Sequence, residues 1–157
     1  MVLTIDYRLT GSGWADCIVR AGERSCKLSA SYVSDALGKL VLAAMAVLAG
    51  AHSVSVGFDV EPGEYRWSVV LTDGSTVRVS ILSFQDLWGN LPDADGTPLL
   101  SISCAPLEFV KSVWEAAEVV LEKHGLADYR DRWGHDFPSQ ELGLLRSYIA
   151  AWERNRG

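Results

Sequence analysis

The sequence has no apolar run long enough to span a membrane. Its most apolar stretch, Leu40–Ala51, has about 12 residues, whereas a membrane-spanning helix needs about 20. The N-terminal residues lack the basic segment and the apolar core of a secretory signal peptide. We therefore expect a cytoplasmic protein with no membrane partner.

Cysteine and positive charge are scarce as well. The three cysteines, an odd number, favour a reducing compartment and free thiols. The chain carries 20 acidic and 14 basic side chains, a formal net charge of −6, and it contains no basic block. Because a nucleic acid is a dense negative charge, we expect no nucleic-acid partner.

Motifs that would hold a cofactor or a metal are also missing. There is no glycine-rich phosphate loop, and Ser12, between two glycines, lacks the flanking pattern of a nucleophile elbow. The run Asp93-Ala94-Asp95-Gly96 resembles the start of a calcium loop, but the later ligands and the closing glutamate are absent. We expect no cofactor and no metal.

What the sequence does contain is a regular alternation of apolar and polar residues, clearest over Val54–Phe84. This period is typical of antiparallel strands with one face buried and one in water. The predicted strands are Val2–Leu9, Trp14–Ala21, a short strand through Cys26, Leu28 and Ala30, three strands within Val54–Phe84, and Leu99–Cys104.

Apolar stripes with helical spacing account for the rest of the chain. The first predicted helix begins after an N-cap at Ser31 or Ser34 and ends at Gly50, and the second runs from Pro106 to about His124, with Gly125 as its end. A short helical turn spans Leu126–Trp133, and the final helix begins at Pro138. The sequence therefore predicts one α+β domain over residues 1–157. We expect two layers, an antiparallel sheet of six or seven strands with the helices packed on one face.

Turn lengths predict how the strands pair. Three-residue loops around Ser12 and Gly74 keep the apolar side chains of neighbouring strands on one face. A two-residue turn at Pro62 would place Glu61 directly opposite Glu64. Like charges that face each other across two strands destabilise a hairpin.

This like-charge pair is the basis of a predicted binding surface. Asp59 lies next on the same solvent-facing side of the sheet, and Trp88 lies in the loop after Phe84. Tryptophan is a common interface anchor. A basic protein partner would relieve the repulsion among the carboxylates. We predict a surface formed by Asp59, Glu61, Glu64 and Trp88; the plainer alternative is a solvated turn whose glutamates splay into water.

A second polar cluster provides the alternative site. His124, Asp128, His135 and Asp136 could bind a metal or perform general acid–base chemistry. His124 and Asp128 are one turn apart only if the helix continues through Gly125, and the plainer interpretation is a polar connection between helices.

We therefore expect a non-catalytic protein-binding domain. The alternative is a small enzyme or ligand-binding domain that uses this cluster.

Three stretches together support a resemblance. The runs Ala30–Leu37, Glu61–Trp67 and His135–Pro138 resemble a type of small bacterial protein with no known activity, so the likeness implies no site. In size, charge and layout the chain is also similar to immunity proteins of bacterial toxin systems. That resemblance implies an antagonist of a bacterial toxin.

The cysteine content gives a first prediction. Denatured, unreduced protein should titrate with three free thiols per chain, because a reducing compartment leaves no disulfide. A titration with a thiol reagent in denaturant checks this, and a value near one would contradict it.

Overall fold

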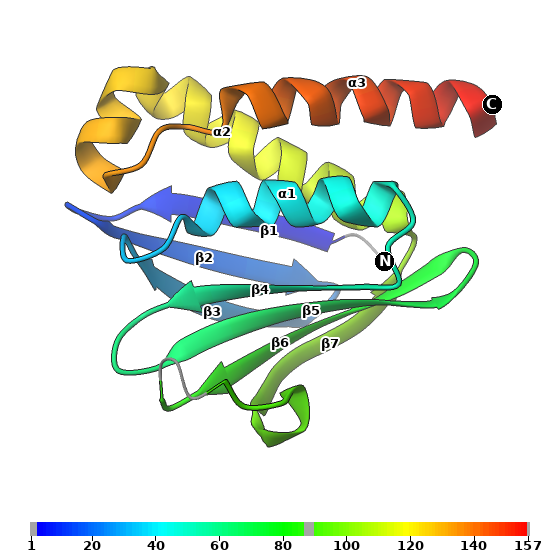
Figure 1. Cartoon of the computed structure of the whole chain (residues 1–157), viewed down its shortest axis with the longest axis horizontal. Coiled ribbons are helices and arrows are strands. Elements are labelled where there is room, and N and C mark those ends of the chain that lie inside the picture. Colours follow the sequence, from blue (N-terminus) through cyan, green and yellow to red (C-terminus); the bar gives the residue numbers. More distant parts are fainter. Residues whose placement is uncertain (1–2, 87–89, 157) are drawn as a thin grey trace.

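The structure, a computed structural model, describes residues 3–86 and 90–156. Its elements are shown in Figure 1. In chain order they are β1 (Leu3–Leu9), β2 (Trp14–Ala21), β3 (Arg24–Ser31), α1 (Ala36–Leu48), β4 (Ser53–Asp59), β5 (Glu64–Asp73), β6 (Thr76–Phe84), a 3-10 turn (Asp93–Asp95), β7 (Thr97–Cys104), α2 (Pro106–Trp133) and α3 (Ser139–Arg156).

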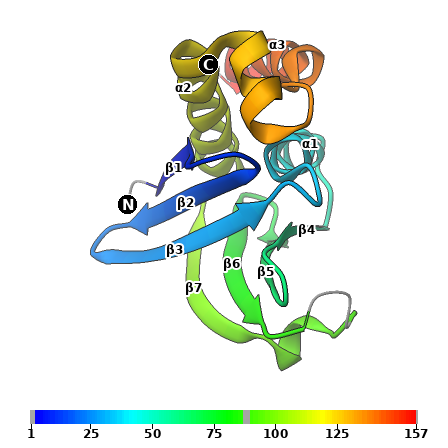
Figure 2. The same cartoon turned by 90° about the vertical axis from the view of Figure 1, so that its left-hand side faces the viewer.

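The strands form two antiparallel sheets, which we call sheet A (β1-β2-β3) and sheet B (β4-β5-β6-β7). The α+β class and the antiparallel pairing are confirmed, but the prediction of one continuous sheet is wrong. β3 packs against β4 and β7 without pairing with either (Figure 2). Alternation assigns each side chain to a face, but it does not say which strand edges hydrogen-bond.

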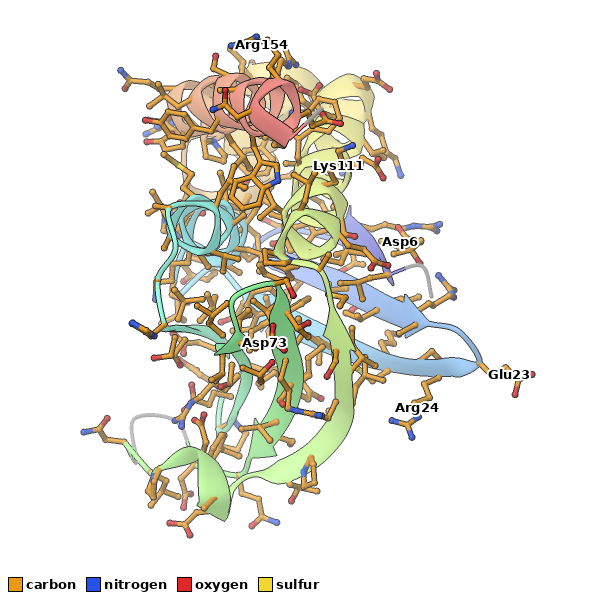
Figure 3. The ribbon with its side chains drawn as sticks, turned by 90° about the vertical axis from the view of Figure 1, so that its right-hand side faces the viewer. Asp6, Glu23, Arg24, Asp73, Lys111 and Arg154 are labelled. Carbon is orange, nitrogen blue, oxygen red and sulfur yellow. The ribbon has the colours of Figure 1, made fainter. Side chains whose placement is uncertain are left out.

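The turn between β2 and β3 projects beyond sheet B. Figure 3 shows Glu23 and Arg24 at its tip. The Arg24 Nη1 donates a hydrogen bond to the carbonyl oxygen of Ser101 on β7, at 3.1 Å. A side chain of sheet A therefore occupies a backbone acceptor on the outer edge of sheet B, which helps to protect that edge from further pairing.

The helices lie on one side of the two sheets, as predicted (Figures 1 and 2). α1 packs on β4, α2 packs on β1, and α3 packs on α1 and α2. Trp67, Phe58 and Leu40 are fully buried in the interior that these elements share. Among the described residues, no helix is both long and apolar enough to cross a membrane.

Two details of the helices concern their ends. The N-cap of α1 is Asp35 rather than Ser31 or Ser34, since its Oδ1 accepts a hydrogen bond from the Gly38 N–H at 3.3 Å. In α2 the backbone of Gly125 leaves the helical conformation, with φ of 71°. The predicted end of the long helix at this glycine is therefore confirmed, although the helical turns that follow continue directly.

The predicted pairing holds for β1–β2 and for the body of β5–β6, but it is wrong for β4–β5. Glu64 lies opposite Asp59, not Glu61. The turn has four residues, and the Val60 N–H donates to the Gly63 carbonyl at 3.1 Å. The register differs by two residues, and because side chains alternate with a period of two, every side chain keeps its predicted face.

Full burial of Trp67 gives a second prediction. Its side chain is 0 % exposed, so Trp67→Ala should lower the free energy of unfolding by about 3–5 kcal/mol. Val119 on α2 is 57 % exposed, and Val119→Ala should change that value by less than about 0.5 kcal/mol. Urea unfolding measures both, and similar values for the two variants would contradict this core.

Candidate protein-binding surface

Arg66 on β5 organises one end of sheet B. Its guanidinium donates hydrogen bonds to Glu64 Oε1 (2.8 Å), Asp93 Oδ1 (3.0 Å) and the Leu91 carbonyl (2.7 Å). Its Cζ lies 4.1 Å from the centre of the Phe84 ring. These contacts hold the irregular segment that precedes β7 against β5 and the end of β6.

Arg66 remains positively charged in this environment. Its side chain is only 12 % exposed, and burial by itself lowers the pKa of a guanidinium. The hydrogen bonds to Asp93 and Glu64 outweigh burial, so the pKa of Arg66 lies above its usual value. The positive charge is therefore used inside the protein, where it neutralises two carboxylates.

The β4–β5 turn packs at the same place. A Cβ built on Gly63 would overlap the Phe84 carbonyl oxygen and lie 3.1 Å from that of Gln85. Glycine is thus required there by close approach of the turn to the end of β6. Glu61, at the tip of the turn, is exposed, and Asp59 is half-buried.

Six carboxylates and one guanidinium lie on the β4–β5 turn, on the strand ends beside it and on the segment that precedes β7. We call this set the acidic end: it consists of Asp59, Glu61, Glu64, Asp86, Asp93 and Asp95, with Arg66. Its formal net charge is −5, against −6 for the whole chain. Arg66 is occupied by Glu64 and Asp93, so the other four carboxylates have no side-chain partner among the described residues.

The structure changes the predicted surface in two ways. Glu64 is 13 % exposed and bound to Arg66, so it is largely buried and is not part of the exposed acidic surface. Asp93 bonds Arg66 and shares the 3-10 turn with Asp95, so these two carboxylates are added to the predicted set. Trp88 lies outside the described residues. The signal for the added carboxylates was the run of acidic residues after Phe84, but nothing local in that run indicates the contact with β5.

In the alternative cluster, His124 and Asp128 do meet. His124 Nδ1 lies 2.7 Å from Asp128 Oδ2, although Gly125 interrupts the helix between them. Asp128 also accepts hydrogen bonds from Arg132 Nε at 3.0 Å. Hydrogen bonds from His124 and Arg132 hold the pKa of Asp128 below its usual value. This carboxylate therefore orients the imidazole and balances one cation.

His135 and Asp136 belong to a different group. His135 Nε2 lies 2.7 Å from the Tyr32 carbonyl oxygen, and Asp136 pairs with Arg130. Both line an open cavity of about 640 Å³ beside the first turns of α1 and α3, whose lining does not include His124 or Asp128. In the described part of the chain, no group of three or more His, Cys, Asp or Glu could hold a metal ion.

Comparisons with known proteins add little to this geometry. No family model matches the sequence, and no curated protein matches it. Among solved structures, the fold is similar to the "CdiA-CT/CdiI toxin and immunity complex from Enterobacter cloacae", with a TM-score of 0.49 and 12 % identity over 73 % of this chain and 100 % of that chain. A likeness of this degree carries no argument about function.

The clamp made by Arg66 gives a third prediction. Arg66→Met leaves the largely buried Glu64 without its partner, so the free energy of unfolding should fall by about 2–3 kcal/mol. Arg78 is exposed on β6, and its hydrogen bond within the described residues goes to the Ser101 hydroxyl. It provides the control Arg78→Met, with a change of less than about 0.5 kcal/mol. Urea unfolding compares them.

The double variant Arg66→Met with Glu64→Gln tests the cause. Replacing the Glu64 carboxylate, which Arg66→Met leaves without a partner, should restore part of the lost stability, because an unpaired charge no longer has to be desolvated. If the double variant is as unstable as the sum of the two single variants, the clamp is not what holds this end together.

Proposed function

We propose that this chain is a non-catalytic protein-binding domain whose acidic end engages a basic protein partner. One observation carries the proposal. Nearly all of the net charge lies at one end of sheet B, and the single base at that end, Arg66, is turned inward onto Glu64 and Asp93. The exposed carboxylates are left without a counter-charge in the described protein.

Unbalanced charge of this kind favours encounter with a cationic surface. Glu61 and Asp95 lie on the turn and on the 3-10 segment, both of them exposed, and Arg66 fixes the segment that carries Asp93. A fixed set of like charges speeds association with a basic partner and disfavours acidic ones. Rim carboxylates act mainly on the rate of association and on its salt dependence, since exposed pairs contribute little net affinity.

A finer form of the proposal is that the partner is a bacterial toxin and that this chain is its antagonist. Its support is the size of the chain and its acidic surface. A toxin whose own substrate-binding face is cationic would be complementary to the acidic end, and burying that face would block it. A toxin gene beside the gene for this chain would favour this form over a general binding domain.

Charge reversal gives a fourth prediction. In Glu61→Lys with Asp95→Lys, two exposed carboxylates of the acidic end become cations. The matched control is Glu115→Lys with Glu122→Lys, which changes the net charge equally on the exposed side of α2. Each protein serves as bait in extract from the organism that carries the gene, at low salt and again at about 0.5 M salt.

A basic protein should be retained by the natural chain and by the α2 control, and lost from the acidic-end variant. Its capture should weaken as salt rises, because the attraction is screened. Association rates with the captured protein, measured at several salt concentrations, should fall most for the acidic-end variant. Equal capture by the folded acidic-end variant and by the natural chain at low salt would rule the surface out.

A further inference from the structure

The outer edge of sheet B is exposed along β7. β6 pairs with one side of β7, and among the described residues no strand pairs with the other side. Leu99 is 38 % exposed, Ser103 is exposed and Ser101 is partly exposed, whereas Leu100 and Ile102 are buried. An open edge of this kind presents main-chain donors and acceptors to which one more strand can pair.

The hydrogen-bond ladder of sheet B shows which main-chain groups point inward. The Leu71 N–H on β5 donates to the His52 carbonyl beside β4 at 2.8 Å. In an antiparallel sheet, successive residues of a strand bond alternately to its two neighbours. Following this alternation through the registers of β5, β6 and β7, Val79 and its partner Ile102 bond each other. The main-chain groups of Ile102 therefore point toward β6.

Ser101 and Ser103 lie on either side of Ile102, so their main-chain groups point away from β6. The Arg24 guanidinium agrees with this direction, because it reaches the Ser101 carbonyl from sheet A. Within the described residues, the Ser101 N–H and both main-chain groups of Ser103 have no hydrogen-bond partner. These two residues can therefore exchange main-chain hydrogen bonds with an added extended segment.

Two guanidiniums converge on Ser101. Arg24 Nη1 donates to its carbonyl oxygen at 3.1 Å, and Arg78 Nη1 donates to its hydroxyl at 3.0 Å. Both arginines are exposed, and neither forms an ion pair in the described part of the chain. A guanidinium has five N–H donors, so most of them are left for another acceptor. A carboxylate matches such a donor set with two parallel hydrogen bonds.

The projecting β2–β3 turn forms a second wall beside this edge. An open groove of about 570 Å³ is lined by Glu23, Arg24 and Ser25 on the side of the turn and by residues 98–101 of β7. Figure 3 shows Glu23 at the tip of the turn and Arg24 nearer to β7. An extended segment that pairs with β7 lies in this groove, with the turn against one of its faces.

We propose that the β7 edge binds an extended segment of a partner protein, and that this segment carries a carboxylate side chain. The segment adds a fifth strand to sheet B by exchanging main-chain hydrogen bonds with Ser101 and Ser103. Its residue opposite Ser101 has its side chain on the same face as the Ser101 hydroxyl, where a carboxylate can bind Arg78.

Arg24 makes the edge selective. In the free protein it occupies the Ser101 carbonyl and so protects the edge. A carboxylate on the incoming segment gives Arg24 a stronger acceptor, which frees the carbonyl for a main-chain N–H. A basic segment offers no such acceptor and is repelled by both arginines. This surface shares no residue with the acidic end, and it prefers the opposite charge.

Three labelled seven-residue synthetic peptides test the proposal by fluorescence anisotropy. The first alternates valine and threonine around a central glutamate, the second has lysine in place of the glutamate, and the third is the acidic peptide with every amide N-methylated. Only the first should bind, because the second has the wrong charge and the third has no main-chain donor. In its presence, the amide hydrogens of Ser101 and Ser103 should exchange with solvent at least about tenfold more slowly.

Variants of the protein locate the binding to this edge. Arg24→Gln with Arg78→Gln should weaken binding of the acidic peptide about tenfold. The matched control, Lys123→Gln with Arg154→Gln, removes two exposed cations of α2 and α3 and should bind as the natural chain does. Ser103→Pro removes an outward N–H at an edge position that tolerates proline, so it should keep the circular dichroism spectrum and lose binding.

Several results would overturn the proposal. They are no binding of the acidic peptide at about 1 mM, equal binding of the acidic and the lysine peptides, and equal binding by the natural chain and the Arg24→Gln, Arg78→Gln variant. If the natural chain sediments as a dimer and Ser103→Pro as a monomer, a second copy occupies the edge and the proposal fails. None of these results bears on the acidic end, because its charge reversals lie outside β7.

Discussion

The interior shared by α1 and the two sheets is the constraint on which the rest of the structure depends. Each sheet has one apolar face, and neither sheet is covered by the other alone. α1 packs on β4 of sheet B and on α2, with Leu37, Leu40 and Val41 fully buried, and α2 covers the edge of sheet A along β1. Burying a helix of this kind stabilises the fold more than any surface ion pair could, because apolar area is the dominant favourable term.

Polar side chains lie in two different environments around this interior. At the far end of sheet B, Glu61, Asp86 and Asp95 are exposed to water, whereas Glu64 and Asp93 are paired with Arg66. Near the start of α1, polar side chains are buried where the β1–β2 turn, the link from β3 to α1 and the end of α2 meet. Buried polar groups in proteins are normally hydrogen-bonded. The first arrangement leaves a charged surface exposed to water. At the second place, the Gly13 N–H donates to the Arg132 carbonyl and so joins the β1–β2 turn to the end of α2.

This separation bears on function. The exposed carboxylates Glu61 and Asp95 of the acidic end lie on a turn and on a short 3-10 segment, outside the strands of sheet B. Exposed carboxylates there can change without disturbing the interior, as is usual for surfaces that adapt to partners. The histidine-bearing segment is different, because His124 and His135 are each engaged by neighbours, one by Asp128 and one by the backbone of Tyr32.

The sequence by itself determined which side chains face inward, because strand and helix periods are local; Trp67 and Leu40 follow directly from their patterns. It also placed the helix break at Gly125. It did not determine the slip of two residues between β4 and β5, because an even shift leaves every face unchanged. Only the tertiary structure divided the strands into two sheets and brought Asp93 onto Arg66. Those features depend on contacts between residues far apart in the chain, and no local period records them.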